Sequence, residues 1–244
     1  MECSVTLRNA IEGLYAAFSN YPLPKFTDPC LHCHSLEDEA KLRSAPLREI
    51  DSDHLRDYAV DALLVWGDIP VFKYFLPRIF ELFVSTPDPA IVFANPEIMF
   101  SKFRHAAWRT WPTGEQLAVE AFLRQVWEEV LGQPPEEGSF TDVESWLCSI
   151  AQCEEDLDPY LHRWIEDERL SACLALSSFL LTSAVARTGT AGRNAFWKGR
   201  DTQYAQLQQW ARTTAVTDKM RLAEIRWGGT DAANEFAMAR SIAS

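Results

Sequence analysis

Residues that could ligate a metal ion crowd together at one place in the first quarter of the chain. Cys30 and Cys33 form a C-x-x-C pair, His34 follows directly, and the surrounding segment is rich in proline. Structural zinc is held by four thiolate or imidazole ligands, and two cysteines at this spacing supply half of such a set. Cys30, Cys33 and His34 are therefore candidate ligands of one structural zinc ion. The sequence has no second C-x-x-C pair, so the alternative is a metal-free loop with two reduced thiols. We therefore expect either no cofactor or this one structural zinc ion.

Sequence patterns of common catalytic and nucleotide-binding sites do not occur in the chain. There is no G-x-x-x-x-G-K-[ST], no G-x-G-x-x-G, no G-x-S-x-G and no H-E-x-x-H. His105 and His162 stand alone on helical segments, which is more typical of surface or core histidines than of catalytic ones. An enzyme is therefore the less favoured class of protein. If the chain is an enzyme, we expect a metal-dependent one that uses the loop around Cys30 and Cys33.

Composition and charge restrict the classes of partner. Of the 244 residues, 47% are hydrophobic and 24% are charged, which is ordinary for a globular protein. The formal net charge of −12 repels the phosphate backbone of nucleic acids, so no nucleic-acid partner is expected. The apolar runs are too short to cross a bilayer, and the N-terminal residues lack a basic stretch followed by an apolar one. We therefore expect no membrane partner and a cytoplasmic location.

Apolar residues recur at helical spacing along nearly the whole chain. Leu7, Ile11, Leu14 and Phe18 draw one apolar stripe, and comparable stripes follow without any run of strand-like alternation. The sequence therefore predicts an all-α fold in which the helices form an irregular array of antiparallel hairpins. An α-solenoid-like arrangement is one form of such an array. The later helices are predicted near 35–43, 51–66, 70–85, 96–108, 113–131, 140–152, 157–165, 168–187, 201–213, 217–226 and 231–242.

One segment has the composition of a linker. Residues 133–138 read QPPEEG, and two prolines followed by charged residues and a glycine disfavour a continuous helix. This divides the chain into an N-terminal helical scaffold at 1–132, which contains the C-x-x-C loop, and a C-terminal helical region at 139–244. Packing of both parts as one continuous domain is the alternative.

Charge is distributed unevenly along the chain. Residues 128–168, here named the acidic segment, contain thirteen Asp and Glu against one Arg. Residues 187–226, the basic segment, contain eight Lys and Arg against three acids. One interpretation is that these are simply solvated helix faces, and the other is that the acidic segment docks a basic protein. The candidate partner-binding residues are Glu136, Glu137, Trp146, Glu154, Glu155, Asp156, Asp158, Tyr160, Trp164, Glu166, Asp167 and Glu168.

Several short motifs in the first half of the chain form a signature. They are LYAAF at 14–18, YPLP at 21–24, C-x-H-C at 30–33, PLR at 46–48, WGD at 66–68 and FLPR at 75–78. With these motifs, residues 7–130 resemble a group of uncharacterised bacterial all-helical proteins. Some proteins of this general kind resemble immunity proteins, which neutralise secreted antibacterial toxins. From this resemblance we expect an immunity function.

The favoured hypothesis is therefore an immunity protein that binds a basic toxin domain through the acidic segment. In this hypothesis Trp146, Tyr160 and Trp164 are the aromatic anchors of the contact. The alternative is a zinc-binding protein or metal-dependent enzyme that uses Cys30, Cys33 and His34.

Overall fold

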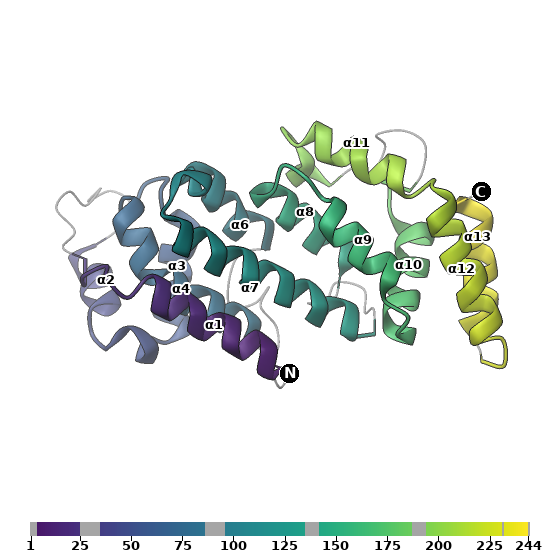
Figure 1. Cartoon of the computed structure of the whole chain (residues 1–244). Helices are drawn as coiled ribbons and strands as arrows, with labels where there is room; N and C mark the ends of the chain where they lie inside the picture. Colours follow the sequence, from purple (N-terminus) through teal and green to yellow (C-terminus); the bar gives the residue numbers. More distant parts are fainter. Residues whose placement is uncertain are drawn as a thin grey trace. The chain divides into compact units, whose positions relative to one another are not determined.

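The computed structural model describes residues 4–24, 35–85, 96–134, 142–186, 194–230 and 232–243. The predicted all-α fold is confirmed: the described residues form a multi-helix array and contain no strand (Figure 1). The one strand-like contact among them is an isolated bridge between Ala62 and Trp66. No helix in the described part of the chain is both long enough and apolar enough to cross a membrane.

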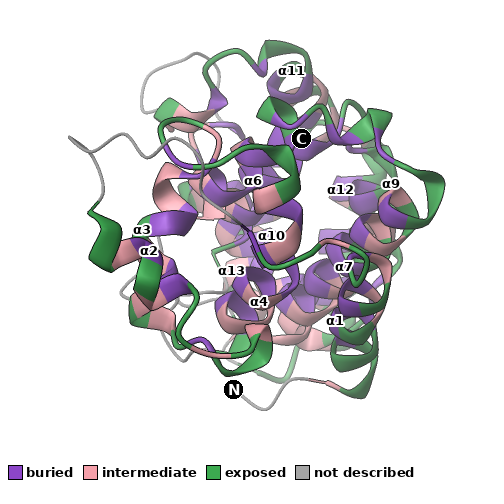
Figure 2. Ribbon diagram, turned by 90° about the vertical axis from the view of Figure 1, so that its left-hand side faces the viewer, coloured by how far each residue is buried: buried purple, intermediate pink, exposed green. Residues whose placement is uncertain are grey.

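The chain divides into two compact units. The first comprises Met1–Val126 and the second Trp127–Ser244, and the division between them falls within helix α7. In both units the buried residues line the helix faces that meet other helices, and the exposed residues lie on the outer faces (Figure 2).

The first unit is built on α4, which packs against α1 and α3. Its described elements are α1 (Val5–Ala17), α2 (Leu36–Leu42), the 3₁₀ turn η1 (Leu47–Glu49), α3 (Ser52–Asp61), α4 (Ile69–Ser85), α6 (Pro96–His105), the 3₁₀ turn η2 (Trp108–Thr110) and most of α7 (Thr113–Gly132).

Polar side chains fix the start of several of these helices. Ser35 and Asp38 form a complete capping box at α2: the Ser35 hydroxyl accepts from the Asp38 N–H, and the Asp38 carboxylate accepts from the Ser35 N–H. Asp68 accepts from the backbone N–H of Val71 at 3.0 Å and so caps α4. Such caps satisfy N–H groups that the helix itself leaves unpaired.

The third helix is shorter than its apolar spacing predicts. A helix from 51 to 66 is expected, but α3 ends at Asp61. The Asp61 carbonyl accepts from the N–H groups of Leu64, Val65 and Trp66, which closes a compact turn. Leu63 has a left-handed φ of 64° in this turn. The helix therefore ends here, although the apolar spacing alone predicts that it continues to residue 66.

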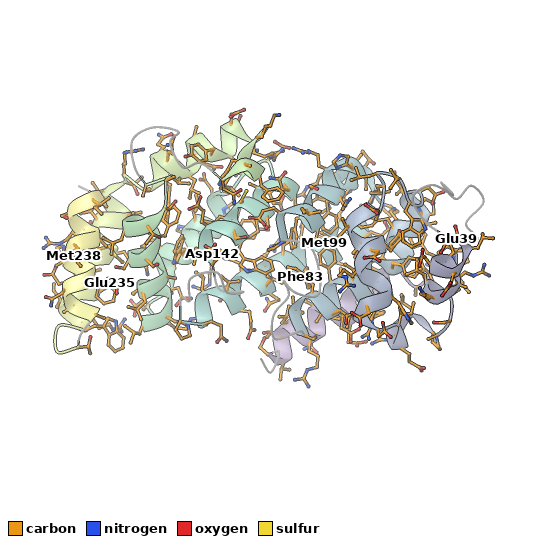
Figure 3. The ribbon with its side chains drawn as sticks, turned by 180° about the vertical axis from the view of Figure 1, so that it is seen from behind. Glu39, Phe83, Met99, Asp142, Glu235 and Met238 are labelled. Atoms are coloured by element: carbon orange, nitrogen blue, oxygen red, sulfur yellow. The ribbon has the colours of Figure 1, made fainter. Side chains whose placement is uncertain are left out.

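Large rings fill the core of the first unit. Phe80 stacks on Phe103, with ring centres 5.3 Å apart and planes inclined by 4°. Phe122 also packs on Phe80, with ring centres 4.9 Å apart. Phe83 and Met99, labelled in Figure 3, are fully buried in this core. Burial of large aromatic side chains is the main stabilising contribution of such a cluster.

The second unit is built around α10, which packs against α8, α12 and α13. Its described elements after the end of α7 are α8 (Val143–Cys153), α9 (Asp158–Glu166), α10 (Leu170–Thr182), the 3₁₀ turn η3 (Ala195–Trp197), α11 (Asp201–Trp210), α12 (Thr214–Arg226) and α13 (Ala232–Ala243). The predicted helices of this half all occur, with ends that differ by a few residues.

Candidate functional site

Trp146, Tyr160 and Trp164, predicted as partner-binding anchors, lie in the core of the second unit. Their exposed fractions are 1%, 4% and 0%. Trp164 stacks on Trp210 with ring centres 5.3 Å apart, and its Nε1 donates to the carbonyl oxygen of Ala172 at 3.0 Å. The prediction is corrected because these rings face other helices, and helical spacing alone cannot separate a core ring from a surface anchor.

Two predicted contact carboxylates, Glu154 and Asp167, are also buried. Asp167 accepts from the backbone N–H of Arg169 at 3.0 Å and from its Nε at 2.9 Å, and it pairs with Arg163 at 3.3 Å. Glu128 forms ion pairs with both arginines. Burial raises the pKa of Asp167, but the hydrogen bonds from Arg169 and the charge of Arg163 outweigh it and leave that pKa below its usual value. These carboxylates therefore serve the fold rather than a partner.

The basic segment neutralises part of the acidic segment within the second unit. The guanidinium of Arg200 donates to the carbonyl oxygen of Glu154 at 2.6 Å and pairs with the carboxylate of Glu155 at 3.2 Å. Arg226 pairs with Glu168 at 2.7 Å. Part of the charge asymmetry of the sequence is therefore neutralised by ion pairs between the acidic and the basic segment.

A buried lysine of the basic segment holds the end of α9. Lys219 is 7% exposed, and its Nζ donates to the carbonyl oxygens of Ile165 at 3.1 Å and Asp167 at 2.5 Å. Burial lowers the pKa of Lys219. Because the last carbonyls of a helix have no partner inside the helix, a cation at this place satisfies them.

Three acidic residues stay exposed at the junction of α8 and α9. We name Glu155, Asp156 and Asp158 the acidic corner. Within the described residues, Asp156 and Asp158 form no ion pair, and both accept from the side-chain amide of Gln206, at 2.6 and 2.8 Å. The backbone N–H of Asp158 and the amide of Gln206 lower the pKa of Asp156, so its carboxylate is ionised near neutral pH. The side chain of Glu155 is 83% exposed in spite of its contact with Arg200.

The remaining predicted contact residues divide into two groups. Glu166 and Glu168 are exposed, and they pair with His162 at 3.1 Å and with Arg226 at 2.7 Å. Glu136 and Glu137 lie outside the described residues.

A cleft between α9 and α12 lies in the same unit. It has a volume of about 380 Å³ and an apolar floor. Its lining consists of Ile165, Glu166, Glu168, Cys173, Ala215, Asp218, Lys219, Leu222, Ala223 and Arg226. Leu222 lies in this lining and is 57% exposed. Sequence periodicity does not single out Leu222, because an apolar residue on a short helix is equally consistent with a core position.

The predicted zinc ligands Cys30, Cys33 and His34 lie outside the described residues. Across the residues that the structure does describe, no group of three or more His, Cys, Asp and Glu side chains is placed to hold a metal ion. Among the described residues, Cys148, Cys153 and Cys173 are buried and belong to no disulfide.

One group of signature residues stabilises the first unit through Tyr15. The Tyr15 hydroxyl donates to Glu81 at 2.5 Å, and Arg78 pairs with the same carboxylate at 2.7 Å. The guanidinium of Arg48 lies 3.6 Å from the centre of the Tyr15 ring and forms two 2.7 Å hydrogen bonds to Glu12. Burial and the carboxylate of Glu81 raise the pKa of Tyr15. These contacts tie α1 and η1 to α4.

A second group centres on Lys73, which is 6% exposed. Its Nζ pairs with Glu115 at 2.7 Å, donates to the Tyr21 hydroxyl at 2.9 Å, and lies 4.3 Å from the centre of the Trp111 ring. The Tyr21 hydroxyl donates to the other oxygen of Glu115 at 2.8 Å. The motifs at 14–18, 21–24, 46–48 and 75–78 thus contain residues with structural roles.

Comparison of the chain with protein families, curated proteins and solved structures gives no match.

Proposed function

We propose that this chain is a protein-binding protein that neutralises a basic antibacterial toxin domain by direct contact, as immunity proteins do. The acidic corner is the contact that we assign to the toxin. The observation that carries the proposal is the exposure of Asp156 and Asp158 without an ion pair among the described residues, beside carboxylates that are paired internally.

The physical argument is electrostatic. Carboxylates already paired with arginine attract a second cation weakly, because the arginine charge cancels most of their electric field. Ionised carboxylates that accept only amide hydrogen bonds still attract a cation strongly. Such a field raises the rate of association with a basic surface and discriminates against acidic ones. Gln206 holds both aspartates in place, which lowers the entropy lost on binding.

The test is coexpression of the chain with basic toxin domains, the first candidates being any that are encoded by genes next to its own. Coexpression of the chain should restore growth, and the double variant Asp156→Lys/Asp158→Lys should lose that protection. Its affinity for the purified toxin should fall about tenfold or more at low salt, and wild-type affinity should weaken as salt is raised.

The matched control is Asp53→Lys/Asp57→Lys, which makes the same charge change on exposed side chains of α3 in the first unit. It should protect as the wild type does. The proposal is overturned if no neighbouring toxin is neutralised, or if neutralisation and affinity are unchanged by both the acidic-corner variant and salt.

A further inference from the structure

We draw no further inference here: the strongest candidate, the cleft between α9 and α12 with the exposed Leu222 in its lining, carries none, because its rim carboxylates are already in ion pairs and nothing in the structure shows what covers its apolar surface.

Discussion

Asp167 illustrates how a single carboxylate of the acidic segment contributes to stability. Its side chain is almost fully buried, and the charges of Arg163 and Arg169 compensate for the loss of hydration. A buried carboxylate without such partners would be protonated rather than ionised. The position in the fold therefore decides that this residue stabilises the second unit and is not available to a partner.

Substitution Asp167→Asn should destabilise the chain in a pH-dependent way. The pKa of Asp167 is lowered in the folded state, so its stabilising effect is complete above the unfolded-state pKa of about 4 and disappears as pH falls through the folded-state pKa. We expect a loss of about 2–3 kcal/mol in the free energy of unfolding at pH 7, shrinking below about pH 4, measured by urea unfolding.

The control for this experiment is Asp218→Asn. Asp218 pairs with Arg221, and both side chains are at least half exposed, so its removal should change the free energy of unfolding by less than about 1 kcal/mol at any pH. A difference between wild type and Asp167→Asn that stays constant from pH 7 to pH 3 would contradict the assigned role.

At the scale of elements, cations from distant parts of the chain satisfy the ends of several helices. Lys102 is 1% exposed, and its Nζ donates to the carbonyl oxygen of Val60 at the end of α3, at 2.5 Å. Lys219 does the same for α9. Arg200 donates to the carbonyl oxygen of Glu154, which follows the last residue of α8. Part of the basic character of the sequence is therefore explained by helix ends that would otherwise be buried without partners.

The connection from α3 to α4 depends on the backbone conformation of Gly67. Its φ of 72° is in the left-handed region, and a Cβ there would lie 2.9 Å from Cγ1 of Val71. We expect Gly67→Ala to destabilise the chain by about 1–3 kcal/mol in urea unfolding, because both the φ angle and the contact become unfavourable.

Gly13 offers a matched comparison. It lies within α1, and a Cβ there has open space around it. Gly13→Ala should stabilise the chain by about 0.5–1 kcal/mol, since alanine has the higher helix propensity. Equal effects of the two substitutions would refute the role of Gly67 in the turn.

At the scale of the whole molecule, the chain has a net charge of −12 but distributes its carboxylates between two uses. Some, such as Glu128, pair with arginine and support the second unit. Others, such as Asp156 and Asp158, are exposed. Negative charge that is not neutralised internally repels other acidic proteins and favours basic ones.

This division predicts different effects of charge removal on stability. Glu128→Gln should lower the free energy of unfolding by about 1–2 kcal/mol, because two arginines lose their common partner. Asp156→Asn/Asp158→Asn should change it by less than about 0.5 kcal/mol, since the amide oxygens of asparagine can accept the same hydrogen bonds. Thermal and urea unfolding of both variants at low salt provide the measurement, and a larger loss in the double variant would contradict the division.

The sequence by itself determined the all-α class and most helix positions. These features depend on residues within one or two turns of each other, so helical spacing predicts them. The early end of α3 could not be predicted in this way, because Leu63 adopts a left-handed φ and leucine is not a residue type that favours this conformation.

Only the tertiary structure decided which residues of the acidic segment reach the surface. Trp164 is buried against rings of α7, α10 and α11, and Asp167 is buried as well. Glu155 is contacted by Arg200 at a separation of 45 residues. The same holds for the cleft, which forms only where α9 and α12 pack together. Periodicity indicates which face of a helix is apolar, whereas burial and ion pairing depend on which distant helix covers that face.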